Sequence, residues 1–216
     1  MLTAYSSRNQ AESNARVAAV ILAAGKSSRM GEAKQLLRLG ESTVLGQTID
    51  NVRRSAVDEI ILVLGGFAEV IRRRLPLIET LRVVVNPSYE QGMASSVRAG
   101  LSAVSPETGA ALIILADQPF VRPETLNRLA EQHRQSRAQI VIPTYGGVRG
   151  NPVLLDRSVF AEVMALEGDV GCRAIFCNHL QGMVKVEVDD EGILLDIDNQ
   201  DDYARLRSLR RGSVTE

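Results

Sequence analysis

Short apolar, β-rich runs alternate with segments of helical periodicity along the chain, and this alternation restricts the fold more than any other feature. The expected strands of the first two thirds are 17–24, 60–64, 81–86, 110–116 and 139–143. The expected helices between them are 42–54, 68–75, 93–104 and 123–136. Such alternation predicts an α/β fold with a mostly parallel sheet and helices on both of its faces.

The last third of the chain has shorter connections. A glycine-rich loop at 146–152 leads into an expected strand at 153–155. Helix-like segments follow at 159–166 and 172–178, and expected strands at 184–188 and 193–198 close the sheet before a last helix at 201–211. Short connections favour antiparallel pairing, so the sheet is expected to be mixed near one edge. We expect one domain at 16–211, with a mobile leader at 1–15 and a tail at 212–216.

Composition excludes several classes of protein. The 216 residues carry a formal net charge of -1, which gives no basic field for nucleic acid. No apolar run reaches the roughly 18 residues of a membrane span, and the polar first 15 residues do not form a signal peptide. Cys172 and Cys177 lie five apart without partners at zinc-ligand spacing. A cytoplasmic protein with reduced thiols, no nucleic-acid partner and no membrane partner is expected.

The segment 17–38 has the composition of an anion-binding loop. A buried strand runs into Gly25, and the next residues contain Gly31 and four cations, Lys26, Arg29, Lys34 and Arg38. Small residues let the backbone approach a ligand, while exposed N–H groups and cations favour a phosphate. Val20 stands where a P-loop needs glycine, and Gly25 and Gly31 do not fit the dinucleotide fingerprint. The alternative interpretation is an ordinary polar loop between a strand and a helix.

Two acidic positions could hold a divalent cation. Asp117 directly follows the expected strand 110–116, at the sheet edge where ligands bind in open α/β sheets. Asp196 and Asp198 are two apart on the expected strand 193–198 and would therefore face the same side. Mg²⁺ takes one or two carboxylates together with substrate phosphates. A turn at Asp117 and a helix-capping cluster at 196–198 are the structural alternatives.

The strings L-A-A-G-x-S-x-R-M-G…K at 22–34, D-x-P at 117–119 and D-I-D-x-x-x-D at 196–202 resemble the nucleotidyltransferase superfamily of MobA-like enzymes. The resemblance implies a Rossmann-like three-layer α/β/α fold. It implies Arg29, Lys34 and Asp117 as catalytic residues, and Asp117 with Asp198 (Asp196 in reserve) as ligands of Mg²⁺, or of Mn²⁺. The implied nucleotide-binding residues are Leu22, Ala23, Ala24, Gly25, Ser28, Arg29, Lys34, Gly65, Asn86, Gln91, Gly92, Ser96 and Asp117.

Three further strings resemble the molybdenum cofactor cytidylyltransferase branch of this superfamily. They are N-P-x-Y-x-Q-G-M-x-x-S-V at 86–97, R-G-N-P at 149–152 and G-D-x-G-x-R at 168–173. Asn151 stands where the branch also has histidine, so no acid–base role carries over to that position. Ser95 or Ser96 could present a hydroxyl and a backbone N–H to the nucleotide, or simply begin a helix. The implied acceptor-binding residues are Gln118, Pro119, Gly150, Asn151, Pro152, Asp169 and Arg173.

The resemblance implies transfer of CMP from CTP to the phosphate of molybdopterin, with release of pyrophosphate. A molybdoenzyme or its chaperone is a further implied partner. Two alternatives stay open: the same chemistry with GTP or with a sugar or alcohol phosphate acceptor, and a non-catalytic module that binds or delivers a nucleotide or cofactor. His133 and His179 are expected at the surface, and no G-x-S-x-G elbow supports covalent hydrolysis.

Overall fold

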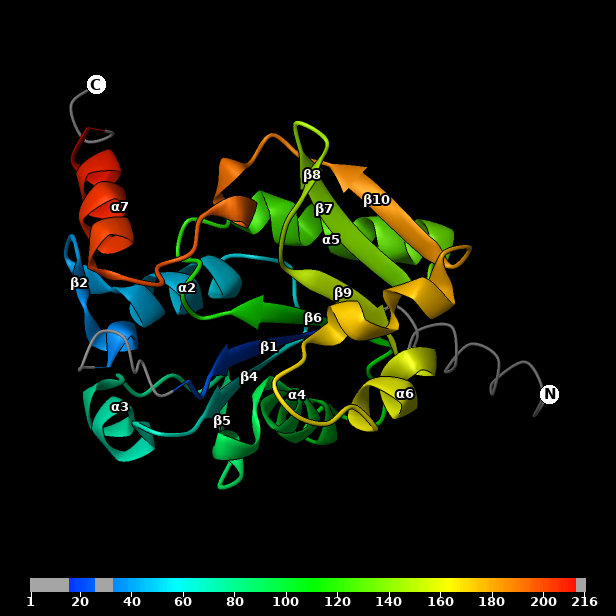
Figure 1. The fold of residues 1–216 in the computed structure, drawn as a ribbon, viewed down its shortest axis with the longest axis horizontal. Helices are drawn as coiled ribbons and strands as arrows, with labels where there is room; N and C mark the ends of the chain where they lie inside the picture. The colour runs from blue at the N-terminus through cyan, green and yellow to red at the C-terminus, as the bar shows by residue number, and fades with distance from the viewer. Residues whose placement is uncertain (1–15, 26–32, 213–216) are drawn as a thin grey trace.

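The structure, a computed structural model, describes residues 16–25 and 33–212. Its centre is an eight-stranded sheet with the strand order β10-β7-β9-β6-β1-β4-β5, and β8 pairs with β7 (Figure 1). The strands are β1 (Val17–Ala23), β4 (Glu59–Leu64), β5 (Leu81–Val85), β6 (Ala110–Leu115), β7 (Ile140–Tyr145), β8 (Val148–Arg149), β9 (Val153–Asp156) and β10 (Met183–Glu187). A separate hairpin is formed by β2 (Arg38–Leu39) and β3 (Ser42–Thr43).

The sheet is mostly parallel, as the sequence predicts. Strands β5, β4, β1 and β6 run parallel to one another, and β10 runs parallel to β7. Strand β9 is antiparallel to both of its neighbours, β6 and β7, and β8 is antiparallel to β7, so the mixed pairing lies towards the β10 end of the sheet, as expected. The carboxyl ends of β1 and β6 therefore lie side by side, which brings Ala24 and Gly25 to the same cavity as Asp117.

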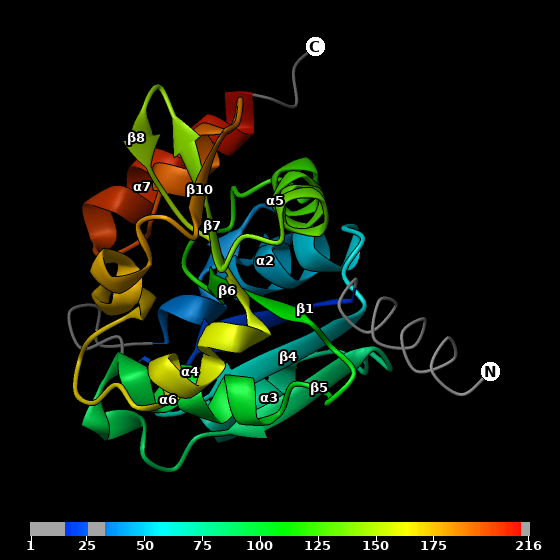
Figure 2. The same ribbon diagram turned by 90° about the vertical axis from the view of Figure 1, so that its right-hand side faces the viewer.

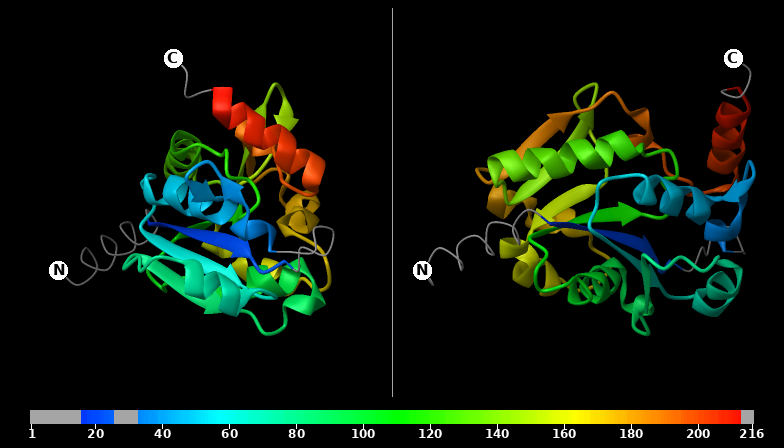
Figure 3. Two further views of the ribbon diagram at one scale, coloured as in Figure 1. Left: turned by 90° about the vertical axis from the view of Figure 1, so that its left-hand side faces the viewer. Right: turned by 180° about the vertical axis from the view of Figure 1, so that it is seen from behind.

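Helices cover both faces of the sheet and give the expected three layers (Figures 1 and 2). One face carries α2 (Val44–Arg53), α3 (Ala68–Arg74) and α5 (Pro123–Ser136), and the other carries α4 (Met93–Ser102), α6 (Phe160–Met164) and the 3-10 segment η4 (Cys172–His179). The helix α7 (Gln200–Gly212) lies beside the β2–β3 hairpin (Figure 3). The remaining 3-10 turns are η1 (Lys34–Leu36), η2 (Tyr89–Gln91), η3 (Arg157–Val159) and η5 (Glu191–Leu194).

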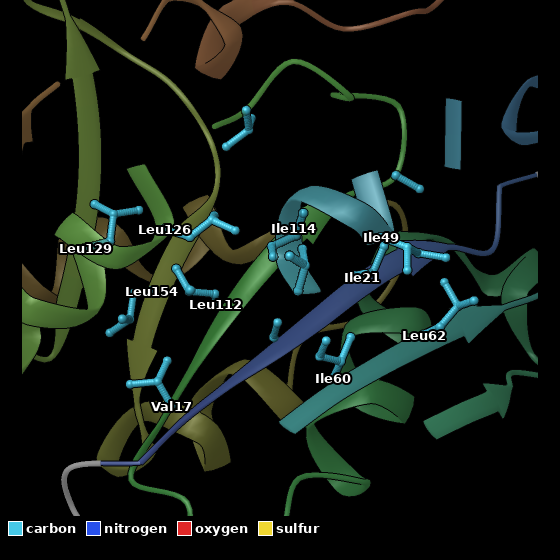
Figure 4. Close-up of a cluster of buried hydrophobic side chains, with 14 of the residues drawn as sticks. Val17, Ile21, Ile49, Ile60, Leu62, Leu112, Ile114, Leu126, Leu129 and Leu154 are labelled. Carbon is cyan, nitrogen blue, oxygen red and sulfur yellow. The ribbon is translucent and has the colours of Figure 1, made fainter. Parts of the chain in front are cut away.

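The period of two along β1 divides its side chains between two cores. Val17 and Ile21 pack with Leu62 and Leu112 in one cluster (Figure 4), and Val20 packs in the cluster on the opposite face. All of these side chains are fully buried. A strand that is apolar on both faces is typical of a sheet covered by helices on both sides. The loops at the carboxyl ends of these strands are thus attached to a rigid support.

Two expectations about local structure are wrong. Residues 193–198 form no strand: the side chain of Asp190 accepts the N–H of Gly192 and starts the 3-10 turn η5, after which the backbone is irregular. Asp196 and Asp198 therefore do not share the face of a strand. His133 is not on the surface but fully buried, with Nε2 2.8 Å from Oδ2 of Asp156.

Three further segments are the two ends of the chain and the residues that follow Lys34. The leader 1–15 and all but the first residue of the expected tail 212–216 lie outside the described residues, and Gly212 is the last residue of α7. The segment from Lys34 forms the short turn η1 before the β2–β3 hairpin. Within the described parts of the chain, no helix is long and apolar enough to cross a membrane.

Candidate active site

A cavity of about 570 Å³ opens where β1 and β6 end and α4 begins. Strand ends at such a position are the usual ligand site of open α/β sheets. The described residues that line it come from these elements and from η1, η2 and two later loops: Leu22, Ala24, Gly25, Lys34, Gln35, Tyr89, Glu90, Gln91, Gly92, Met93, Ser96, Leu115, Ala116, Asp117, Asp169 and Asp198.

Lys34 brings the two predicted metal carboxylates together. Its Nζ donates to Oδ2 of Asp117 at 2.6 Å, to the backbone oxygen of Ile197 at 3.1 Å and to Oδ1 of Asp198 at 3.4 Å. Burial opposes the charged ammonium, but the negative charges of Asp117 and Asp198 outweigh burial and raise the pKa of Lys34 above its usual value. Residues far apart in the chain thus form one charged cluster on the cavity wall.

The carboxylates of Asp117 and Asp198 are suited to a hard divalent cation that also binds substrate phosphates. The Lys34 ammonium lies within reach of both carboxylates, which shows that a positive charge can sit between them. Oδ1 of Asp117 is buried and has no hydrogen-bond partner among the described residues. The described residues contain no group of three or more His, Cys, Asp or Glu side chains suited to a metal, so oxygen ligands from a substrate would have to complete the coordination.

Asp196 lies next to this cluster. Burial raises its pKa, and the negative charges of Asp117 and Asp198 raise it further. Its side chain lines a neighbouring cavity rather than the first one. The structure therefore groups Asp198, and not Asp196, with Asp117 around Lys34.

Three predicted nucleotide-binding residues, Ala23, Gly65 and Asn86, do not line the cavity but lie next to residues that do. A Cβ on Gly65 would lie 2.5 Å from the backbone oxygen of Ala24, so only glycine lets β4 and β1 end so close together. Asn86 is buried, and its amide donates to the hydroxyls of Ser95 at 2.9 Å and Ser96 at 3.1 Å. Of this pair only Ser96 lines the cavity. Ala23, like Gly65 and Asn86, does not line it.

A second cavity of about 300 Å³ adjoins the first, and Leu22, Met93 and Leu115 line both. Two of the predicted acceptor residues, Asn151 and Arg173, line this second cavity. Its other described lining residues are mainly apolar: Val97, Ile113, Val153, Gly171 and Cys172, together with Asp196. Burial raises the pKa of the Cys172 thiol to about 12, so this sulfur stays protonated.

The other predicted acceptor residues lie elsewhere. Gln118 is buried, with its amide directed at the backbone oxygen of Ile193, and the backbone oxygen of Pro119 accepts the amide of Asn51. Gly150 packs against Ile193, and neither Gly150 nor Pro152 lines a cavity described above. Asp169 lines the first cavity rather than the second.

Two predicted residues, Ser28 and Arg29, lie outside the described residues. The structure adds cavity residues that the sequence did not indicate: Gln35, Tyr89, Glu90, Met93, Leu115 and Ala116. Most are chain neighbours of predicted residues, so the same strings could have indicated them. Gln35 is buried one residue after Lys34, with its amide directed at the backbone oxygens of Ala23 and Gly25.

The fold and the cavity define the chain as a nucleotidyltransferase. The family model of the MobA-like NTP transferase domain matches residues 19–183, which include most of β1, Lys34, Asp117 and the residues that line the second cavity except Asp196. The chain belongs to this family.

Two relatives match most of the chain. The chain is 27% identical to the molybdenum cofactor cytidylyltransferase of Escherichia coli strain K12, over 85% of this chain and 92% of the relative. It is 30% identical to the nicotine blue oxidoreductase of Paenarthrobacter nicotinovorans, over 88% and 96%.

The crystal structure of Rv0371c from Mycobacterium tuberculosis H37Rv is similar at a TM-score of 0.82 and 36% identity, and covers 89% of this chain and 97% of that chain. A structure of Rv0371c in complex with manganese matches at a TM-score of 0.77 and 33% identity, over 89% and 98%. A divalent metal thus binds to a protein similar to this chain.

Proposed function

We propose that this protein transfers CMP from CTP to a terminal phosphate of a molybdopterin-type acceptor and releases pyrophosphate. The observation that carries the proposal is the convergence of Lys34, Asp117 and Asp198 on the wall of a cavity large enough for a nucleotide. The name of the E. coli relative supports CTP as donor and the molybdenum cofactor as acceptor.

The residues of the chain position charges and do not form a covalent intermediate. Lys34 would hold the triphosphate at the carboxylates, and Arg29 would contribute a second cation. Gln91, Gly92 and Ser96 would bind the nucleoside at the start of α4, where they line the cavity. In such a site the catalytic effect comes from alignment of the reacting groups and from neutralisation of developing charge.

Asp117 and Asp198 would hold the metal, with Mg²⁺ proposed and Mn²⁺ as the alternative. When bound, such an ion neutralises phosphate charge and stabilises attacking and leaving oxygens. The orphaned Oδ1 of Asp117 favours this role, because a buried carboxylate oxygen without a partner is costly unless a ligand binds it.

The second cavity is proposed as the acceptor site. Its apolar wall suits a planar ring system, and Arg173 can pair with a phosphate. Asn151 supplies an amide but no titratable group. Because both cavities share Leu22, Met93 and Leu115, an acceptor phosphate and a nucleotide α-phosphate can meet between them.

Sequence identity alone does not separate the activities of the two relatives, since the oxidoreductase is as similar as the cytidylyltransferase. The cluster of Lys34 with two carboxylates favours nucleotide transfer, because hydride transfer requires neither carboxylate.

The proposal is tested by measuring pyrophosphate release with Mg²⁺ and each of CTP, GTP, ATP and UTP, with and without molybdopterin. Release with CTP only, and only with the pterin, is expected. Pyrophosphate release with GTP instead of CTP would identify GTP as the nucleotide donor. Release with a sugar phosphate instead of the pterin would identify a sugar phosphate as the acceptor. Nucleotide binding without pyrophosphate from any NTP would contradict the enzyme proposal and favour a binding module.

A further inference from the structure

The loop 166–173 is bound to the first turn of α4. Oδ1 of Asp169 accepts the backbone N–H of Met93 at 3.2 Å, and the backbone oxygen of Gly168 accepts that of Ala94 at 3.2 Å. Arg98, one turn further along α4, donates to the backbone oxygen of Leu166 at 2.9 Å. The first N–H groups of a helix need partners from outside the helix, and here a distant loop supplies them.

Gly92 makes this contact possible. Its φ is +102°, and a Cβ at this position would lie 2.4 Å from the backbone oxygen of Gly168. Gly92 is the N-cap residue of α4 and has no side chain to cap the helix itself. The two strings at 86–97 and 168–173 therefore fit together, with glycine at the point of contact and Asp169 as the cap.

The same loop runs from the first cavity to the second. Asp169 lines the first cavity, and Gly171, Cys172 and Arg173 line the second. Met93 lines both, and a Cβ on Gly171 would lie 3.0 Å from its sulfur. The backbone position of Arg173 thus depends on how the loop is attached four residues earlier.

We propose that Asp169 is a positioning residue that fixes Arg173 at the acceptor cavity by holding the loop 166–173 on the start of α4. This inference rests on the proposed function for its substrates. Asp169 would act through Arg173 and would not bind the acceptor itself. Its carboxylate would repel a triphosphate in the first cavity. Asp169 would therefore position the loop through the hydrogen bond that it accepts, and not through its charge.

The first experiment compares Asp169→Ala with Asp169→Asn, because asparagine keeps the accepting oxygen and removes the charge. Asp169→Ala is expected to raise the acceptor KM about tenfold, the usual effect of losing one hydrogen bond to a charged group, with the CTP KM changed less than about threefold. Asp169→Asn should stay within about threefold of the wild type for both substrates. Glu167→Gln, an exposed acid on the same loop, is the matched control.

A double-mutant cycle with Arg173→Ala tests whether Asp169 acts through Arg173. Asp169→Ala should add little to the acceptor KM of Arg173→Ala, because the two changes remove one function. Additive effects, an equal rise in both KM values, or an Asp169→Asn variant as impaired as Asp169→Ala would each overturn the proposal.

Amide hydrogen exchange tests the positioning role of Asp169 independently of the proposed function, because it requires no enzymatic activity. In the protein without substrates, Asp169→Ala should speed exchange in peptides that cover 93–95 and 170–176, and Asp169→Asn should not. This result stands even if the wild type transfers no nucleotide. Unchanged exchange in Asp169→Ala would overturn the positioning role, whatever the enzyme does.

Discussion

The Nζ of Lys34 lies 2.6 Å from Oδ2 of Asp117, although the two residues are separated by 83 positions in the chain. Lys34 stands at the start of η1 beyond β1, and Asp117 follows β6, the neighbour of β1 in the sheet. The parallel pairing of these strands brings the predicted phosphate cation and the predicted metal ligand to one point.

Replacing Asp117 with asparagine should abolish most of the activity and keep the fold. The amide cannot supply the charge that a divalent cation needs, so kcat/KM should fall at least about a hundredfold. Pyrophosphate release measures the effect, and far-UV circular dichroism measures the fold. Asp189→Asn, at an exposed position, is the control. Normal turnover by Asp117→Asn would show that the metal assignment is wrong.

Replacing Lys34 with glutamine should weaken CTP binding. Among the described residues that line the first cavity, Lys34 is the one that carries a positive charge. Loss of a charged hydrogen bond to a phosphate should raise the dissociation constant by about tenfold or more. Calorimetric titration with CTP and Mg²⁺ gives this constant, and Lys185→Gln on the exposed side of β10 should bind CTP normally. Unaltered affinity in Lys34→Gln would argue against phosphate binding by Lys34.

Leu112→Ala should destabilise the protein by about 2–5 kcal/mol, because it leaves a cavity between β6 and the helices above it. Leu112 is fully buried in the cluster of Figure 4. Leu77, in contrast, is fully exposed, and Leu77→Ala should change the stability by less than about 0.5 kcal/mol. Urea unfolding compares the two variants. Equal effects would contradict the described packing.

The pair of His133 and Asp156 predicts how stability depends on pH. Burial opposes ionisation of Asp156, but its hydrogen bonds with His133 and Ser158 outweigh burial and lower the pKa of the carboxyl below its usual value. A lowered pKa in the folded state adds stability above the pKa of the unfolded chain, and this stability disappears as the pH falls through the folded value.

Asp156→Asn should therefore be less stable than the wild type near neutral pH, by about 1 kcal/mol, and the difference should shrink below about pH 4. Urea unfolding at a series of pH values measures the difference. Asp189→Asn removes an exposed carboxylate and should show no such trend. A difference that grows on acidification would contradict the assigned direction of the pKa shift.

The sequence predicts the strands well because most of them are apolar on both faces and end at glycine, proline or a polar residue. The segment 193–198 has the same apolar character and yet is no strand. Ile193 and Ile197 are both fully buried, but they pack in two different clusters. The backbone of Ile197 bonds to Asp117 and Lys34 instead of to a neighbouring strand. Such distant partners cannot be deduced from local periodicity.

The burial of His133 was predictable, since its position follows the spacing of Leu126, Leu129 and Ala130 on the buried face of α5. The polar neighbours of His133 in the chain suggested a surface position instead. The contact of Gly92 with Gly168 was not predictable, because each glycine has a local interpretation as a turn. For the same reason Asp169 could be assigned to a substrate but not to the cap of a distant helix.

The most direct test of the central claim uses CTP that carries a radiolabel at either the α- or the γ-phosphate. The protein is incubated with this CTP, Mg²⁺ and molybdopterin, and the product that contains the label is identified. Transfer of CMP predicts that the α-label appears in the pterin product and the γ-label in pyrophosphate, and that Asp117→Asn loses both. A γ-label in the pterin product, or free phosphate as the sole labelled product, would contradict nucleotidyl transfer at this site.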